Sequence, residues 1–370
     1  MKLIKLNYNE LIENTTNNPW ELKGLALSDF NLIIGKNSAG KSRTIRVIVT
    51  LSNIIALRTP LIDGTWHIEF ENKLSGKMTK IVYELKIVAK KVVSEKILID
   101  GKVKLDRNGN TRIFSETGNK FINIEPPDDK LVLHIRRDKL EYEFFEYLIN
   151  WAMSVRGYEF SDVRPGDITI ENNITSLVRL NTVPQVAEKL KIDSARIKNV
   201  ISEFNSIGYE IENIEVSKVS SAPIDVKILE IKEKGIKYLI QQMNLSQGMF
   251  RALALLIIIN YLLQTKEIST ILIDDLCEGM DFEHATNYAK LIYEKLRTAN
   301  IQLIATSNDS FLMNVVDIKY WNILKRENTV VNAYNYENSK NIFEEFRSTS
   351  LNNFDFFTSN YYTKLGFTPK

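Results

Sequence analysis

Residues Gly35 to Ser42 read GKNSAGKS and match the pattern G-x-x-x-x-G-K-[ST] in full. They follow an apolar run, Phe30 to Ile34, and precede a stretch with helix-forming composition. A strand, a glycine-rich loop and a helix in this order form a phosphate-binding loop, because backbone N–H groups and the positive helix end face the same anion. The alternative, a glycine-rich and serine-rich turn that matches by chance, does not explain this order.

The residue types in the loop suit phosphate chemistry. Gly35 and Gly40 let the backbone approach phosphate oxygens where a Cβ would obstruct them. Lys41 provides a charge for the β- and γ-phosphates, and the Ser42 hydroxyl is a ligand for Mg²⁺. The loop alone does not distinguish a site for ATP from a site for GTP. The predicted nucleotide-binding residues are Gly35, Lys36, Asn37, Ser38, Ala39, Gly40, Lys41, Ser42 and Arg43.

Composition narrows the class of protein. The chain has 370 residues, of which 44% are apolar and 25% are charged, so it can bury a large core. With one cysteine, Cys277, it has no internal disulfide, and its three histidines offer no spacing for zinc or iron. The net charge of +2 argues against an attraction of the whole surface to nucleic acid. It does not exclude a local stripe of basic residues that binds nucleic acid.

No segment of the sequence reads as a membrane span or a signal peptide. The longest apolar stretch, Ala252 to Asn260, is too short to cross a bilayer. The N-terminus alternates like a strand and lacks a long apolar core. We therefore expect a cytoplasmic protein without a membrane partner.

The pattern along the chain changes twice. Short alternating runs between Trp66 and Ile124 predict antiparallel hairpins, whereas the stretches 138–155 and 182–204 have helical spacing. From about residue 246 helices alternate with apolar strands, which predicts a parallel sheet. We expect an N-terminal lobe over 1–135 with the loop and an antiparallel β subdomain, a helical insertion over 136–208, and a C-terminal lobe with a tail over 209–370.

A second motif ends the apolar run Thr270 to Asp275, TILIDD. A run of this kind predicts a strand that is buried on both faces and carries Asp274 to its carboxyl end, beside the phosphate loop. Asp274 would then hold Mg²⁺ together with Ser42. Its neighbour Asp275 would polarise the attacking water as a general base.

A third motif lies between these two. Leu245 to Arg251, LSQGMFR, opens an apolar helix with a serine at the N-cap position. The motif resembles the LSGGQ-type signature of ABC ATPases, in which the helix end receives the γ-phosphate held by another subunit. The resemblance implies that Ser246, Gln247 and Gly248 act in trans. A plain serine N-cap is the alternative.

Two further segments resemble ABC ATPases in the family order. Glu278 to Asp281 resembles the D-loop, with Asp281 at its end, and Gln302 to Asp309 resembles the switch strand. The resemblance covers roughly residues 1–60 and 240–320. The long gap before the signature is similar to the SMC-like and OLD-like branch, and within it to stand-alone ATPases of prokaryotic anti-phage systems. It implies a P-loop ABC-ATPase-like mixed sheet that binds ATP and Mg²⁺.

The chain departs from the family pattern at two positions. The glutamate that usually follows the Mg²⁺ aspartate is Asp275, whose carboxylate is one methylene shorter, so slow hydrolysis is expected. The switch histidine is Asn308, which can orient a phosphate or a water but cannot carry a proton. Asp275, Lys41 and Asn308 are the predicted catalytic residues. Glu278 is a candidate substitute for the missing glutamate, and a surface turn acid is the alternative.

The resemblance implies an ATPase switch that dimerises head to tail on ATP, or forms a higher oligomer. It would control a separate effector such as a nuclease in anti-phage defence, since no nuclease motif follows the switch strand. An SMC-like ATPase that binds or repairs DNA is the first alternative. A transporter ATPase subunit is the second. A phosphotransferase would use the same loop but has no use for the Ser246 helix.

Overall fold

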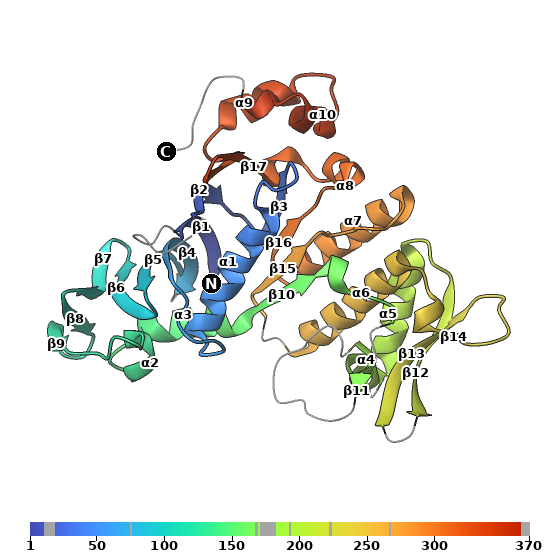
Figure 1. The fold of residues 1–370 in the computed structure, drawn as a ribbon, viewed down its shortest axis with the longest axis horizontal. Coiled ribbons are helices and arrows are strands. Elements are labelled where there is room, and N and C mark those ends of the chain that lie inside the picture. The colour runs from blue at the N-terminus through green and yellow to red at the C-terminus, as the bar shows by residue number, and fades with distance from the viewer. Residues whose placement is uncertain are drawn as a thin grey trace.

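The computed structural model describes residues 1–10, 19–74, 76–166, 169–170, 183–191, 194–221, 224–265 and 268–363. Figure 1 shows a long twisted sheet that runs across the molecule, with helices packed against it and a smaller sheet at one end. In the described part of the chain the large sheet has 14 strands and the small sheet has four. The predicted class, α/β with a mixed sheet and an antiparallel part, is confirmed.

The strands of the large sheet come from the N-terminal third and the C-terminal third of the chain, apart from β10. Their bounds are β1 Lys2–Asn9, β2 Glu21–Ala26, β3 Phe30–Gly35, β4 Gly64–Leu74, β5 Lys77–Val88, β6 Lys91–Ile99, β7 Lys102–Asn108, β8 Asn110–Ser115, β9 Lys120–Ile124, β10 Val155–Glu159, β15 Thr270–Asp274, β16 Gln302–Thr306, β17 Trp321–Glu327 and β18 Val330–Asn335. The order across the sheet is β10-β15-β16-β3-β17-β18-β2-β1-β4-β5-β6-β7-β8-β9.

Strands β10, β15, β16, β3 and β17 run parallel to their neighbours in this order. Every residue of β3, β15 and β16 is buried, as expected for strands covered on both faces. Because the carboxyl ends of parallel strands lie at one edge of a sheet, the segments that follow β3, β15 and β16 meet there. Only β16 separates the strand of the phosphate loop from the strand of Asp274.

Strands β4 to β9 form an antiparallel meander, as the alternating pattern predicts. One face of this arm is apolar and packs against helices α1 and α3, and the rings of Phe70 and Trp151 meet there at 4.8 Å. The opposite face carries half-buried and exposed polar side chains. The arm is therefore a one-sided antiparallel sheet that continues the parallel half.

The helices cover both halves of the sheet. Their bounds are α1 Lys41–Ile55, α2 Val132–Ile135, α3 Glu143–Ser154, α4 Val183–Lys191, α5 Ser194–Ser206, α6 Gln247–Thr265, α7 Phe282–Thr298, α8 Ser310–Val315, α9 Lys340–Arg347 and α10 Asn353–Thr358. Among the described residues one segment, Gln247–Gln264, is long and apolar enough to cross a membrane. Since 72% of it is buried inside the protein, α6 has the properties of a core helix.

The middle of the chain differs from the prediction in its strands and in one helix. The stretch 136–208 contains α3, α4 and α5, but it also contains β10, which pairs with β15 as the end strand of the large sheet. The small sheet consists of β11 Thr169–Ile170, β12 Ile211–Ser221, β13 Ile224–Glu233 and β14 Ile240–Gln241. The predicted helix over 182–204 is two helices, and Thr182 lies outside the described residues. The division into three segments stays a prediction.

Glu95 is a fully buried carboxylate in the arm. Its oxygens accept hydrogen bonds from the Tyr83 hydroxyl at 3.1 Å and from the Val132 N–H at 2.8 Å. Burial raises the pKa of Glu95 to about 7, although these bonds and the charge of Arg107 act in the opposite direction. The group therefore gains or loses its proton near neutral pH in the folded chain.

We expect the Glu95 contribution to the free energy of unfolding to fall as the pH rises from about 4.5 to 7. In this range the folded chain keeps a proton that the unfolded chain has lost, so rising pH favours unfolding, by at most about 1.4 kcal/mol per pH unit. Urea unfolding between about pH 5 and 8 should show a shallower pH dependence in Glu95→Gln than in the wild type. Equal slopes in the two proteins would contradict this expectation.

Candidate functional site

The predicted phosphate loop joins the carboxyl end of β3 to the first turn of α1. Its backbone is left-handed at Ser38 (φ 63°) and at Gly40 (φ 105°), which curls the chain. A Cβ on Gly40 would also lie 3.0 Å from the ring of Trp20. Gly35 has a different reason to be glycine, since a Cβ there would lie 2.8 Å from the Leu324 carbonyl oxygen in β17. One glycine shapes the loop, and the other lets it pack against the neighbouring strand.

The start of α1 is suited to an anion. Its N-cap residue, Gly40, forms no side-chain capping hydrogen bond, so the N-cap leaves the first backbone N–H groups of the helix available to an anion. Ser42 and Arg43 are half-buried on this turn, and Ala39 is buried beside it. The other loop residues, Lys36, Asn37 and Ser38, are exposed.

Lys41 is only 6% exposed, and its amine lies within the loop. Its Nζ donates hydrogen bonds to the carbonyl oxygens of Gly35 at 2.9 Å and of Lys36 at 3.4 Å. Burial lowers the pKa of Lys41, while the carboxylates of Asp275 and Asp274 act in the opposite direction. The fold thus brings the lysine and both predicted carboxylates into one neighbourhood.

The two carboxylates follow β15. Asp274 is the last strand residue and is 8% exposed, and the chain turns at Asp275 with a left-handed backbone (φ 54°). The Thr306 hydroxyl, at the end of β16, donates a hydrogen bond to Asp274 Oδ1 and accepts one from the Asp275 N–H at 2.8 Å. Burial raises the pKa of Asp275, and the charges of Asp274 and Glu278 add to this effect. A raised pKa favours proton uptake by a general base.

The residues at this edge fit Mg²⁺. Two neighbouring carboxylates repel each other, and the Asp274 charge contributes to the raised pKa of Asp275. A divalent cation would relieve this repulsion. Carboxylate and hydroxyl oxygens, such as those of Asp274 and Ser42, are the ligands that Mg²⁺ prefers. The predicted metal ligands stay a prediction that the chemistry of this edge supports.

The predicted signature opens α6. Ser246 is its N-cap, and the Ser246 hydroxyl accepts a hydrogen bond from the Met249 N–H at 3.2 Å. Ser246 and Gln247 are exposed, whereas Gly248 is buried. A Cβ on Gly248 would lie 2.5 Å from the carbonyl oxygen of Gly279, so this glycine is required for packing within the chain. Among the described residues no hydrogen bond or ion pair joins Ser246 to the phosphate loop.

Arg251 ties the signature helix to the acidic turn after β15. It is 7% exposed and donates hydrogen bonds to the carbonyl oxygens of Glu278 at 3.1 Å and Val163 at 3.1 Å, and to that of Ser161. Its guanidinium also lies 3.6 Å from the Glu278 carboxylate. Arg251 therefore joins α6, the turn after β15 and the segment after β10.

Asp281, the predicted D-loop residue, is the N-cap of α7. Its Oδ1 accepts hydrogen bonds from the N–H groups of Glu283 and His284, both at 3.1 Å, and its Oδ2 lies 2.6 Å from His284 Nδ1. The His284 backbone bond and ring lower the pKa of Asp281. The carboxylate of Asp281 thus has a local structural task, and a role toward nucleotide stays a prediction.

Asn308 lies where the switch residue is expected, two residues beyond the end of β16, and is exposed. The next residue, Asp309, caps α8 through hydrogen bonds from the N–H groups of Phe311 and Leu312. Since β16 lies between β3 and β15, Asn308 emerges between the phosphate loop and Asp275. This placement suits orientation of a phosphate or a water.

Two further residues at this edge, Thr306 and Glu159, were not predicted from the sequence. Thr306, which holds Asp274 and Asp275, lies within the predicted switch strand, but only Asn308 of that segment was a predicted site residue. Glu159 ends β10 opposite Asp274 in the register. A hydrogen bond with Asp162 raises the pKa of Glu159, and burial adds to the effect. Glu159 ends a strand of five residues that lies between two helical stretches. A strand this short cannot be distinguished from the helices around it by the periodicity of its apolar residues.

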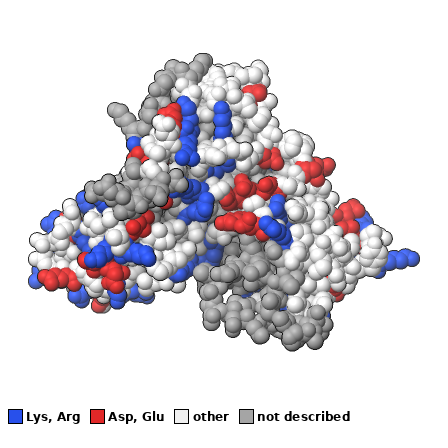
Figure 2. Space-filling model, in the orientation of Figure 1, with Lys and Arg blue, Asp and Glu red and all other residues white. Residues whose placement is uncertain are grey.

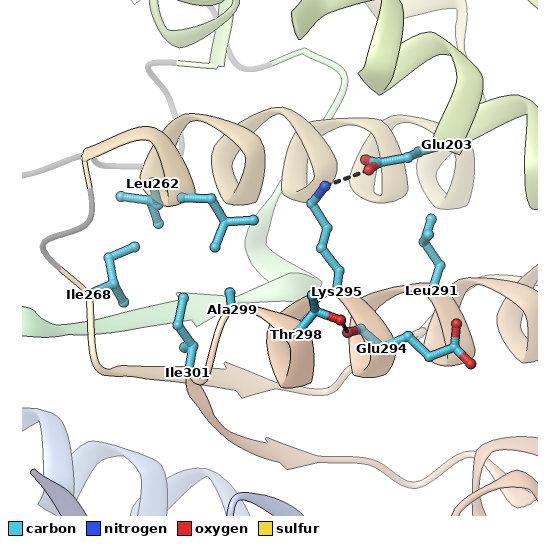
Figure 3. Close-up of a pocket in the computed structure, with 10 residues that line it drawn as sticks. Glu203, Leu262, Ile268, Leu291, Glu294, Lys295, Thr298, Ala299 and Ile301 are labelled. Carbon is cyan, nitrogen blue, oxygen red and sulfur yellow. Dashed lines mark hydrogen bonds and ion pairs between the residues drawn. The ribbon is translucent and has the colours of Figure 1, made fainter. Parts of the chain in front are cut away.

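A cavity of about 750 Å³ lies elsewhere, between α5, α6 and α7 (Figure 3). Its apolar wall includes Leu262 and Ile301, and the Glu203–Lys295 ion pair lies on another wall. Ile301 directly precedes β16, so the cavity is at the amino ends of the strands, opposite Asp274. It is separate from the predicted site.

Basic and acidic side chains lie close together near the centre of the face in Figure 2. Ion pairs join basic and acidic side chains in the described part of the chain, as between Arg43 and Glu10 beside the phosphate loop. On the described part of this face the two signs are interspersed, which differs from the continuous basic stripe expected of a nucleic-acid groove.

Comparison with solved structures finds SMC head domains. An SMC head bound to the C-terminal winged-helix domain of ScpA is 14% identical, with 90% of this chain and 96% of that chain covered and a TM-score of 0.50. The Smc head with an extended coiled coil, bound to the C-terminal domain of ScpA and derived from Pyrococcus furiosus, is 13% identical, with 94% and 99% covered and a TM-score of 0.50. No protein-family model and no curated protein matches the chain. The chain therefore has the fold of an SMC head domain.

Proposed function

We propose that this protein is an ATPase of the SMC-like kind, in which ATP binding is the switch and hydrolysis resets it. The observation that carries the proposal is the meeting of two elements at one sheet edge. The phosphate loop with its buried Lys41 ends β3, and the Asp274–Asp275 pair ends β15 one strand away. This is the arrangement that phosphoryl chemistry requires, because catalysis there rests on positioning and charge.

Each residue at the edge has a distinct task in this proposal. The amine of Lys41, now on the loop carbonyls, moves to the β- and γ-phosphate oxygens, while the uncapped start of α1 holds them through backbone N–H groups. Ser42 and Asp274 would hold Mg²⁺, which neutralises phosphate charge when bound. Asp275 orients the attacking water and accepts its proton, and Thr306 keeps Asp275 in place. Asn308 orients the γ-phosphate side of the site.

The site in one copy is half complete in this proposal. The N-terminus of α6 carries the exposed Ser246 and Gln247, and no described contact joins them to the phosphate loop. Two copies arranged head to tail would each present this helix end to the other's γ-phosphate, so ATP would join them. A higher oligomer built from such pairs fits the same contacts.

The partner of the switch is a further part of the proposal. Both similar SMC heads are bound to a domain of ScpA, a separate protein. We propose by analogy that this chain also acts through a separate protein. A nuclease effector, a role in anti-phage defence and the DNA-binding alternative, all from the sequence resemblance, stay predictions.

The proposal is tested by changing Asp275 to asparagine. This change removes the proton acceptor but keeps the size of the side chain, so we expect ATP binding to persist and hydrolysis to fall by a factor of about 100 or more. ATP should then hold the variant as a dimer in size-exclusion chromatography with light scattering, and ADP should not. A variant that hydrolyses ATP at the wild-type rate, or that stays monomeric with ATP, would count against the proposal.

A further inference from the structure

Arg43 is held rigidly beside the phosphate loop. It follows Ser42 in the first turn of α1, and its guanidinium carbon lies 4.9 Å from the centroid of the Trp20 ring. The Glu10 carboxylate forms an ion pair with the same guanidinium. The ring and the carboxylate hold the guanidinium from two directions, so Arg43 is a positioned planar group.

The aromatic residues around Arg43 are not open to a ligand. Trp20 is 1% exposed and Tyr8 is 6% exposed, and their rings pack against each other at 5.8 Å. The edge of Trp20 also lies against Gly40 of the phosphate loop. The rings of Tyr8 and Trp20 are therefore part of the core. The Arg43 side chain, which is 32% exposed, is the outermost member of this stack.

We propose that Arg43 is the platform for the base of the bound nucleotide. One face of the guanidinium rests on Trp20, and the opposite face stacks on the base, so that ring, cation and base form three layers. This inference rests on the proposed function, since the triphosphate must lie in the loop. Lys41 and Ser42 serve the phosphates and the metal, and Arg43 is the next residue along the same turn.

The chemistry of this platform predicts its selectivity. Arginine stacks on base faces through cation–π and planar contact, and every base has such a face. Stacking alone binds a purine more tightly than a pyrimidine because the purine ring system is larger. It gives little discrimination between adenine and guanine. Because Glu10 already forms an ion pair with Arg43, the charge of Arg43 should add little to the binding of the phosphates.

Binding of three Mg²⁺-loaded ligands tests the inference: ATP, CTP and inorganic triphosphate, which has no base. In Arg43→Leu we expect ATP affinity to fall about tenfold and the ATP-over-CTP preference to shrink, with affinity for inorganic triphosphate within about twofold of wild type. Arg43→Lys keeps the charge and can keep the Glu10 pair but lacks the planar face, so it should show the same pattern. Arg46→Leu, an exposed arginine of the same helix, is the matched control and should change none of the three affinities.

Each other outcome has a definite meaning. Equal losses for ATP and inorganic triphosphate in Arg43→Leu would make Arg43 a phosphate ligand and overturn the inference. Unchanged ATP affinity in both Arg43 variants, with wild-type melting temperatures, would overturn it as well. A wild-type protein that binds none of the three ligands would instead overturn the proposed function, so the two failures are distinguishable.

Discussion

Replacing Lys41 by methionine is expected to abolish ATP binding and, with it, hydrolysis. The Lys41 amine is the buried charge of the loop, with Gly35 and Lys36 carbonyls as its present acceptors. Hydrogen bonds that involve a charged group contribute about 1.5 to 3 kcal/mol each. Loss of two such bonds to phosphate should weaken ATP affinity by a factor of at least about 100. Isothermal titration with ATP and Mg²⁺, and a phosphate-release assay, measure both effects.

The control for this change is Lys77→Met, which removes an exposed lysine of the arm. It should bind and hydrolyse ATP as the wild type does, because Lys77 only pairs with Asp100 on the surface. Methionine keeps the length and the apolar stem of Lys41, so the fold should persist and circular dichroism should show the same melting temperature within a few degrees. ATP affinity that survives in Lys41→Met would remove the central support for a nucleotide site here.

The sequence could predict those parts of the site in which the residue types depend on the conformation of a short, contiguous segment. The phosphate loop is a contiguous string whose residue types follow from backbone geometry and charge. The run that ends at Asp274 predicted a strand buried on both faces, and β15 is fully buried. Ser246 and Asp281 lie at helix N-caps, where their residue types are favoured.

The parts that sequence could not predict depend on contacts between distant segments. Gly248 looked like a ligand-facing glycine, but its reason in this chain is the Gly279 carbonyl oxygen against which it packs. Thr306 lies in a buried strand, and it can contact Asp274 and Asp275 only because β16 pairs with β15. The pairing of β10 with β15 joins residues more than a hundred positions apart. Such contacts leave no periodic signal in either segment.

A side-chain turn that competes with the helix explains why the predicted start of one helix was wrong. The spacing of apolar residues in 138–155 predicted a helix that begins at Asp138. In the structure Asp138 Oδ1 accepts hydrogen bonds from the N–H groups of Leu140 at 2.8 Å and Glu141 at 3.1 Å. This side-chain turn competes with the helix, which begins at Glu143 instead. Leu140 is left 81% exposed.

The contacts of Gly248 and Arg251 bear on how one copy could signal to another. Both bind the first turns of α6 to the turn Glu278–Gly279, which follows Asp275 closely. The exposed helix end and the turn that follows the predicted general base are therefore in direct contact within one copy. A partner that shifts the helix end would shift the approach to Asp275, so assembly and hydrolysis would be coupled in the proposed dimer.

The second prediction with a large effect is that Ser246→Arg abolishes ATP-dependent dimerisation while ATP still binds to the single copy. Ser246 is exposed at the start of α6, so arginine fits without a clash inside the chain. In the proposed dimer the long side chain would block the helix end from the other copy's γ-phosphate. Loss of the N-cap costs about 1 kcal/mol, which the melting temperature will report separately. Light scattering with ATP, using the hydrolysis-deficient Asp275→Asn background, measures the dimer.

The site of this substitution matters as much as its size. Any side chain on Gly248 would collide with Gly279, so a Gly248 variant that fails to dimerise would report misfolding as readily as a blocked interface. Thr298→Arg is the matched control, because Thr298 is exposed near the cavity end of α7, away from the nucleotide edge. It should dimerise with ATP as the background protein does. ATP-dependent dimers that persist in Ser246→Arg would exclude a signature helix acting in trans, and would favour a phosphotransferase that uses the same loop within one copy.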